Sequence, residues 1–321
     1  MFKIAKTTTW LAAGLLAAGG ALFVSQPAQS VHEISVFELD GNVVEGGGGG
    51  EDWTTVNFGG LSGTQLAKTG VLADPAPASI FTGGGSKDDN DISAWKFKTG
   101  SVPDKDDITN AFAAAYNVGG DLVIYAGADR IDNSGDAFMG FWFFQNQVGL
   151  GTGGGGGGTS FTGSHAVGDV LVLANYTGGG TNVSIEVLRW VGVGGNVNGT
   201  LQRIAGGPGG SPATCATGLG LHNFCAITNT TGGETPPWPY TNKDGGGTYP
   251  TAAFLELGIN ISKVFAAAGV GGTPCFSTFM AETRSSSSVS AVLKDFALGS
   301  FPVCGVAVSK VCKNPTLVRN A

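Results

Sequence analysis

Short apolar segments separated by glycine-rich turns are the feature that most constrains how this chain folds. The clearest segments span residues 122–126, 137–145, 170–176 and 183–191, and weaker ones recur at 252–261, 275–282 and 289–296. Apolar runs of this length and spacing are typical of sandwiches, and no fixed repeat indicates a propeller or solenoid. Glycine supplies 56 of 321 residues, yet 42% are hydrophobic, enough for a core. We predict an all-β, jelly-roll or concanavalin-like β-sandwich with long glycine-rich loops.

One helix is expected in this sandwich. Residues 106–116 read DDITNAFAAAY, with acidic residues in the first turn and alanine through the body. Acidic residues favour the positive end of a helix dipole, and alanine is the best helix former. A shorter helix could form around Leu66, inside the otherwise loop-like stretch 59–79, and residues 192–250 show little regular pattern.

The N-terminus reads as a secretory signal peptide. Lys3 and Lys6 precede an apolar run over residues 10–24, and small residues precede a cut after Ser30. That run is shorter than the roughly 20 residues a membrane span needs. We predict a signal peptide over residues 1–30, a secreted sandwich domain over 31–312 and a disordered tail over 313–321. No later segment is expected to enter a membrane.

The charge balance limits the class of partner. The formal net charge is −7, and loss of the two signal-peptide lysines makes it −9. Nucleic acids and anionic membranes are bound through basic surfaces, so neither is expected as a partner. An acidic surface remains compatible with cation binding.

All five cysteines lie in the last third of the sequence. In an exported protein they favour disulfides, and no CxxC or HxxxH pattern indicates a metal site. We expect the pairs Cys215–Cys225 and Cys304–Cys312, with Cys275 free or bonded to another chain. Spacing alone leaves this connectivity open.

The usual catalytic patterns are missing from the sequence. Glycoside hydrolysis needs two carboxylates at a defined separation, and the Glu-x-Asp-x-x-Glu strand signature of concanavalin-like hydrolases does not occur. Glu186, Glu256 and Glu282 stand singly on expected strands, where we expect them to be solvated. His165 lies near Thr159-Ser160, but without the helix a serine protease needs there, we expect it to cap a strand or turn. The chain is therefore expected not to be an enzyme.

Two acidic clusters are candidate calcium sites, because Ca²⁺ prefers several oxygen ligands on loops. The first contains Asp88, Asp89, Asn90 and Asp91, and the second contains Asp129, Asp132, Asn133 and Asp136. The second cluster is held between two expected strands, so repulsion among its carboxylates would favour a bound cation. Arg130 is the alternative source of positive charge. The alternative is that both clusters are turns in which Asx side chains bond to their own backbone.

Three aromatic residues are candidates for sugar binding, since aromatic faces stack on pyranose rings. Trp238 and Tyr240 lie in a proline-rich loop, and Trp95 lies beside the first acidic cluster. Trp142, Phe143 and Phe144 are expected to belong to the core, because their segment is continuously apolar.

Four groups of segments resemble a known type of protein. They are 36–42 with 52–53, 85–88 through 95–107, 127–130 through 140–145, and 281–286 through 293–296. Together they are similar to the N-terminal module of large, uncharacterised secreted bacterial surface proteins, in which Ig-like or prealbumin-like repeats often follow. The resemblance implies a surface location and brings no catalytic residues. This chain ends at Ala321, where longer relatives continue, which leaves open a free-standing or a truncated form.

The predicted function is an extracellular, non-enzymatic surface, adhesion or structural module. Its expected partners are cell-surface or matrix components, carbohydrate among them. The alternative is a calcium-dependent carbohydrate-binding protein, with Ca²⁺ as its cofactor, and a glycoside hydrolase is a remote third.

Overall fold

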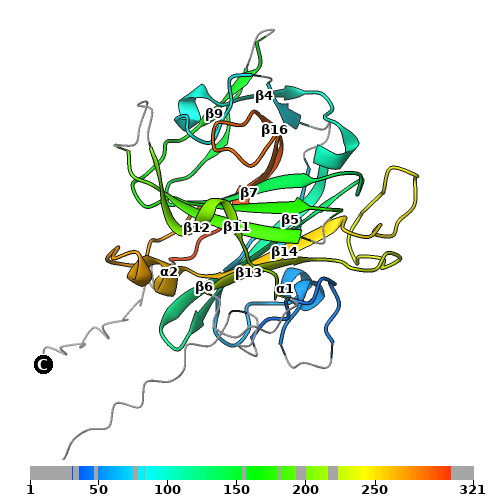
Figure 1. The fold of residues 1–321 in the computed structure, drawn as a ribbon, viewed down its shortest axis with the longest axis horizontal. Coiled ribbons are helices and arrows are strands. Elements are labelled where there is room, and N and C mark those ends of the chain that lie inside the picture. The colour runs from blue at the N-terminus through cyan, green and yellow to red at the C-terminus, as the bar shows by residue number, and fades with distance from the viewer. Residues whose placement is uncertain are drawn as a thin grey trace, which may run out of the picture.

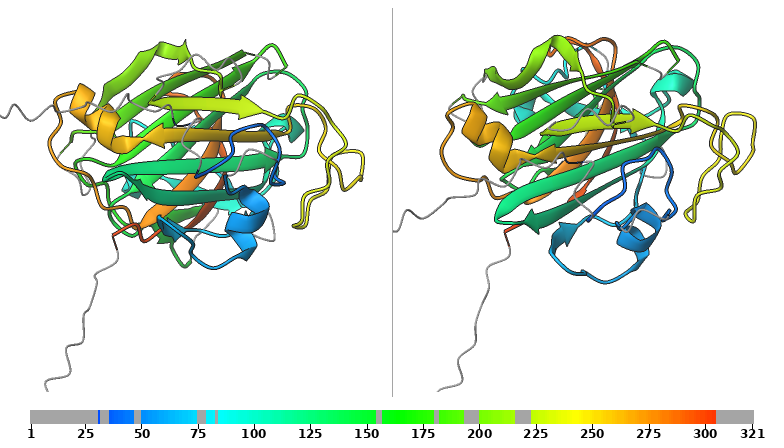
Figure 2. Two further views of the ribbon diagram at one scale, coloured as in Figure 1. Left: turned by 90° about the horizontal axis from the view of Figure 1, so that it is seen from below. Right: turned by 60° about the horizontal axis from the view of Figure 1, so that its bottom comes forward.

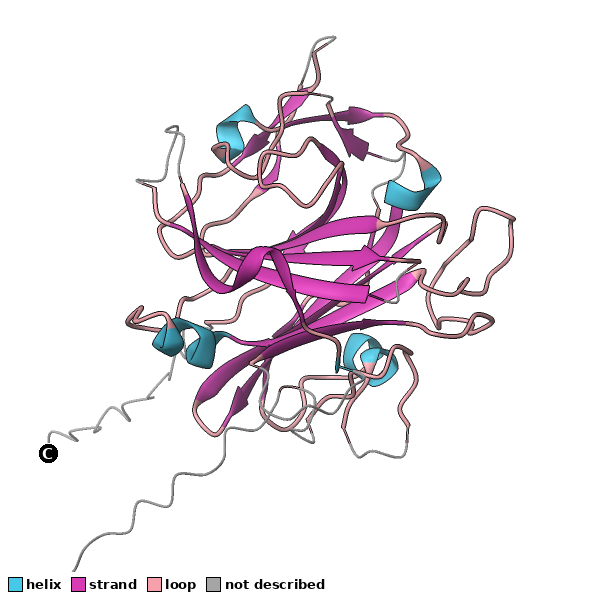
Figure 3. Cartoon of the chain, in the orientation of Figure 1, coloured by secondary structure: helices cyan, strands magenta, loops and turns pink. Residues whose placement is uncertain are grey.

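Two antiparallel β-sheets lie face to face and form the body of the protein (Figures 1 and 3). The computed structural model describes residues 31, 36–46, 50–74, 79–82, 84–153, 157–179, 182–192, 200–215 and 223–304. Its helices are short: α1 (Trp53–Phe58), α2 (Ile261–Ala267) and the 3₁₀ turns η1 (Ile92–Ala94) and η2 (Asp104–Asp106). In the described residues, no helix has the length and apolar character needed to cross a membrane. The prediction of an all-β sandwich is confirmed.

The smaller sheet has six strands in the order β1-β5-β6-β14-β13, with β2 also paired to β5. Its strands are β1 (Gln65–Lys68), β2 (Leu72–Ala73), β5 (Ile108–Val118), β6 (Asp121–Arg130), β13 (Phe224–Thr228) and β14 (Phe254–Asn260). The expected strand at 252–261 is thus confirmed as β14, whereas β13 arises in a stretch without regular pattern.

The larger sheet has ten strands in the order β12-β11-β10-β7-β15-β16-β3-β4-β9-β8. The strands that the sequence predicted are β7 (Ala137–Phe144), β10 (Val170–Thr177), β11 (Asn182–Trp190), β15 (Thr278–Arg284) and β16 (Leu293–Ser300). Those that it did not predict are β3 (Ser79–Phe81), β4 (Lys96–Thr99), β8 (Gly149–Leu150), β9 (Thr159–Thr162) and β12 (Leu201–Pro212).

Both sheets are covered on both faces, which explains why their central strands read as continuous apolar runs. One core lies between the sheets, where Ile124 and Leu257 of the smaller sheet meet Phe141 and Phe279 of the larger. A second core lies under the N-terminal segment and α1, on the outer face of the smaller sheet (Figure 2). A third lies on the other face of the larger sheet, where residues of β7, β10 and β11 meet residues of β3 and β9 from the far end of the same sheet, and it contains Trp142 and Phe144. With Phe143 also fully buried, the core prediction for these three aromatic residues is confirmed.

The helix expected over residues 106–116 is wrong, because the segment forms strand β5. Its side chains alternate with a period of two: Ala113 and Ala115 face the core between the sheets, and Phe112 and Tyr116 face the outer core. Burial on two faces outweighs the helix propensity of alanine. The helix suggested around Leu66 is likewise a strand, β1, which pairs with β5.

Gly127 follows the apolar segment 122–126 but does not end its strand. Strand β6 continues through it to Arg130, and Gly127 pairs with Phe112 of β5. A Cβ atom at Gly127 would lie 2.4 Å from the Phe112 ring, so only glycine leaves room for that ring.

The disulfides partly contradict the expected pairing. Cys215–Cys225 is confirmed, but Cys275 bonds to Cys304. Strands β15 and β16 are antiparallel neighbours with Thr278 opposite Ser300, so the residues just before β15 and just after β16 meet. Local spacing carries no sign of this contact. Cys312, the proposed signal peptide and the tail lie outside the described residues.

Candidate functional site

A pocket of about 560 Å³ opens where the long connection between β13 and β14 meets β2 and the start of β5. Most of its lining is apolar, and its polar side is formed by two carboxyls, a threonine and an asparagine. The lining residues are Phe58, Val71, Ala73, Asp74, Asp107, Ile108, Thr109, Asn110, Ile131, Pro237, Trp238 and Pro239. Pockets that combine apolar walls with a few convergent polar groups are the usual places for small ligands.

Trp238, one of the predicted ligand-binding residues, lines this pocket, is 5% exposed and is held firmly. Its Nε1 donates a hydrogen bond of 2.9 Å to Asp129 Oδ2, and its ring packs 5.0 Å from that of Phe112. Asn110 Nδ2 donates to the carbonyl of Pro239 at 3.0 Å and to Asp129. The proline-rich loop is therefore fixed to strands β5 and β6, and the pocket wall is formed before any ligand arrives.

The other two predicted ligand-binding aromatics lie elsewhere. Tyr240 is buried, and its hydroxyl donates to the carbonyl of Arg130 at 2.9 Å, so it supports the Trp238 loop from behind. Trp95 is fully buried in the third core, where its Nε1 donates to the carbonyl of Lys87 at 2.8 Å. The structure therefore places one of the three aromatics at the pocket.

Three carboxyls meet at the acidic side of the pocket. Asp74 follows β2, Asp107 precedes β5, and Asp295 lies on β16 of the opposite sheet. Each offers an oxygen atom, and these atoms lie within 4.8 Å of one another. Asp295 is buried and accepts a hydrogen bond of 2.7 Å from the Ile108 amide, whereas Asp74 and Asp107 are half-buried and line the pocket. We refer to these three residues as the acidic trio.

Burial is the main cause of raised pKa values in the acidic trio, and repulsion from nearby carboxylates adds to it: from Asp74 and Asp107 on Asp295, from Asp107 on Asp74, and from Asp104 on Asp107. The pKa of Asp295 rises from 3.8 to about 9, that of Asp74 to about 7 and that of Asp107 to about 6. Groups with pKa values near neutrality in a pocket are typical of functional sites. The sequence does not predict the acidic trio, because contact between the two sheets brings its members together.

These pKa values predict how stability depends on pH without divalent cations. A carboxyl with a raised folded-state pKa stabilises the fold fully below its unfolded pKa, near 4, and loses that stability as pH rises through its folded pKa. In EDTA, the melting temperature should fall as pH rises from 5 to 9, and Asp295→Asn should flatten that fall. Calorimetric melting at each pH checks this, and an identical slope in both proteins would contradict it.

The second predicted calcium cluster is not assembled around one point. Asp129 is fully buried, and its carboxylate accepts hydrogen bonds from Trp238, Tyr249 and Asn110. Asp132 pairs with Lys243 at 2.6 Å, and Asp136 accepts from the Gly178 amide at 3.0 Å. Asn133 is half-buried on the same loop. Strand β6 extends through Asp129, which removes this residue from the expected loop.

The first predicted calcium cluster is also dispersed. Asp88 pairs with Arg284 in the interior, and Asp89 accepts a hydrogen bond of 2.5 Å from the Ser290 hydroxyl. Asp91 caps η1 by accepting from the Ser93 amide at 3.0 Å. Within the described part of the chain, the acidic trio is the one group of three or more acidic, histidine or cysteine side chains that meets the 4.8 Å spacing.

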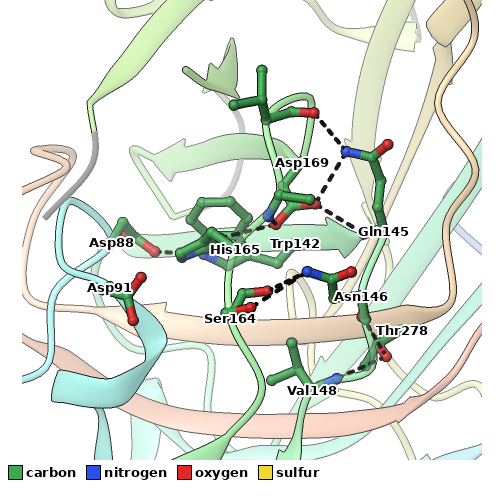
Figure 4. A network of polar contacts seen from close by, with 12 residues as sticks. Asp88, Asp91, Trp142, Gln145, Asn146, Val148, Ser164, His165, Asp169 and Thr278 are labelled. Atoms are coloured by element: carbon green, nitrogen blue, oxygen red, sulfur yellow. Dashed lines mark hydrogen bonds and ion pairs between the residues drawn. The ribbon is translucent and has the colours of Figure 1, made fainter. Parts of the chain in front are cut away.

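A network of buried polar groups crosses the third core (Figure 4). Asp88 accepts a hydrogen bond of 2.8 Å from Trp142 Nε1. His165 Nδ1 lies 3.0 Å from Asp169 Oδ2, and the His165 ring stacks on Trp190 at 3.8 Å. His165 lies in the turn before β10, and its side chain is buried in the third core. All of these side chains are buried, which leaves no access for a substrate and indicates a structural role.

The expectation that the three strand glutamates are solvated is wrong. Glu186 is buried against Arg203, and Glu256 accepts from the Gly41 amide at 2.7 Å and from Trp53 Nε1 at 2.9 Å. Glu256 thereby fastens the N-terminal segment to the smaller sheet. Glu282 is fully buried over Gly140, where an added Cβ would lie 1.8 Å from its Oε1. Burial raises the pKa values of Glu256 and Glu282 well above the usual range.

Sequence reasoning found Trp238 but missed Phe58, Asn110 and the acidic trio. Asp74 follows the two-residue strand β2 and Asp107 precedes β5, positions that carry little signal on their own. Asp295 has no other acidic residue close to it in the sequence. No family model matches the chain, and neither a curated protein nor a solved structure matches it.

Proposed function

We propose that this chain is a non-enzymatic extracellular adhesion module that binds a carbohydrate of a surface or matrix component in the Trp238 pocket. The observation that carries the proposal is the pocket itself, in which aromatic, proline and aliphatic side chains stand opposite two carboxyls and an amide. A sugar ring has the matching character, with apolar C–H faces and hydroxyl groups at its rim. The two disulfides suit a protein that works outside the reducing cytoplasm.

The rigidity of the pocket supports a binding role. Trp238, Tyr249 and Asn110 all bond to the buried Asp129 carboxylate, and prolines restrict the loop backbone on both sides of Trp238. A site formed in advance loses little conformational entropy when a ligand binds. Phe58, at the end of α1, is 59% exposed and adds an open aromatic surface beside Trp238.

A glycan array probed with the oxidised protein tests this function, in calcium and in EDTA. We expect binding to a restricted set of glycans, and a loss of about tenfold or more in affinity for Phe58→Ala, since a stacked aromatic ring contributes on the order of 1–2 kcal/mol. The matched control is Leu61→Ala, because Leu61 is equally exposed at 59% but does not line the pocket. Absence of binding in both conditions would contradict the proposal and favour a purely structural module.

A second candidate function, glycoside hydrolysis, has one observation in its favour. Asp74 and Asp107 line the same pocket with pKa values of about 7 and 6, and a carboxyl of raised pKa can act as a general acid. Mass spectrometry of an array ligand after long incubation separates the two functions. Intact glycan supports binding alone, whereas cleavage that Asp107→Asn abolishes would establish an enzyme.

A further inference from the structure

The acidic trio contains buried oxygen atoms without a donor. Asp295 is 1% exposed, and its Oδ1 has no hydrogen-bond partner among the described residues. Asp74 Oδ1 and the neighbouring Thr109 Oγ1 are buried and unpartnered in the same way. Buried polar atoms are nearly always satisfied in proteins, so a group of unsatisfied oxygens points to a bound species, a water or a cation, that satisfies them.

Among the residues that the structure describes, no basic side chain is paired with the acidic trio. The charged groups that most affect Asp295 are Asp74 and Asp107, and the one that most affects Asp107 is Asp104, all of them acidic. Each of the six described ion pairs joins other residues. The acidic trio therefore differs from the buried carboxyl of Asp88, which has Arg284 beside it.

We propose that the acidic trio binds a divalent cation of the calcium type, held by Asp74, Asp107 and Asp295 between the two sheets. Ca²⁺ takes six to eight oxygen ligands in flexible geometry, and carboxylates are its preferred protein ligands. Three carboxylates supply the charge, and Asp74 and Asp107 face the pocket, from which solvent can complete the coordination shell. The site is distinct from both clusters that the sequence suggested.

The position of the site gives the cation a structural effect. Asp74 and Asp107 belong to the smaller sheet, at β2 and β5, and Asp295 lies on β16 of the larger sheet, which packs against both. A cation that bonds to all three joins the two sheets at their edge. Binding to the folded state alone stabilises it by mass action. The proposal goes beyond the glycan function, because it needs no glycan.

Calorimetric titration and thermal melting of the oxidised, EDTA-treated and dialysed protein test the site at pH 8, with CaCl₂ as the probe and no glycan present. We expect saturable binding of one Ca²⁺ per chain and a rise in melting temperature of about 5 °C or more at a hundredfold excess over Kd. Asp295→Asn and Asp74→Asn should each abolish both. Two variants are used because Asp295 is buried, while Asp74 is half-buried and tolerates change better.

Asp132→Asn is the matched control, since it removes one acidic charge near the pocket from a residue that pairs with Lys243 and lies outside the acidic trio. It should keep the calcium response. The proposal is overturned if the parent protein shows neither a heat of Ca²⁺ binding nor a rise in melting temperature. It is also overturned if folded Asp295→Asn and Asp74→Asn variants bind Ca²⁺ as the parent does. Calcium binding without any glycan binding would uphold this site and refute the proposed function. Glycan binding without calcium binding would uphold the proposed function and refute this site.

Discussion

Replacement of Arg284 by methionine should destabilise the protein by about 3–5 kcal/mol, the cost of breaking a buried ion pair by removal of one partner. Arg284 is fully buried; its guanidinium bonds to Asp88 and lies 3.9 Å from Glu282. Methionine keeps much of the aliphatic volume but leaves two buried carboxyls without their counter-charge. Guanidinium chloride unfolding, followed by tryptophan fluorescence, measures the loss.

Arg203→Met is the matched control for this substitution. Arg203 also pairs with a strand glutamate, Glu186, but its side chain is 39% exposed. Solvent screens such a pair, so its loss should cost about 1 kcal/mol or less. Equal losses of unfolding free energy in the two variants would contradict the large contribution expected of the buried Arg284 pair.

Removal of the Cys275–Cys304 disulfide, by Cys275→Ala with Cys304→Ala, should cost about 3–4 kcal/mol in the chain-entropy account. The bond closes a loop with a sequence separation of 29 and fastens the ends of β15 and β16. Without the disulfide the unfolded chain gains conformational entropy, while the folded sheet keeps the hydrogen bonds between β15 and β16. Denaturant unfolding of oxidised parent and double variant measures the difference.

The equivalent change at Cys215 and Cys225 provides the comparison. That bond spans a separation of 10, so its removal should cost less than removal of the longer loop. A larger loss at Cys215–Cys225, or no loss at Cys275–Cys304, would contradict the pairing. Peptide mapping of the parent without reduction should show both bonds and leave Cys312 as the odd cysteine.

The apolar segments predicted the central strands because burial on both faces leaves a strong local signal. Segments such as 137–145 and 170–176 contain too many large apolar residues for any exposed element. The alanines of β5 pack in the cores on both faces of the smaller sheet. Alanine is also the best helix former, so the sequence of this strand wrongly predicts a helix. The shortest strands, such as β3 and β8, are two or three residues long and leave no pattern at all.

The candidate site was less accessible to sequence reasoning. An aromatic residue among prolines marks Trp238 as a candidate ligand-binding residue, but the sequence suggests a metal ligand at its partner Asp129, which the fold buries. The acidic trio joins residues up to 221 positions apart, from Asp74 to Asp295, through contact between sheets. Contact of that kind depends on the packed fold, and local composition does not encode it.

The most direct test of the central claim is a crystal structure of the protein with CaCl₂ and the tightest glycan from the array. The account predicts a sugar ring in the pocket against Trp238 and Phe58, and a cation among Asp74, Asp107 and Asp295. A glycan bound elsewhere on the surface, with only water in the Trp238 pocket, would contradict it.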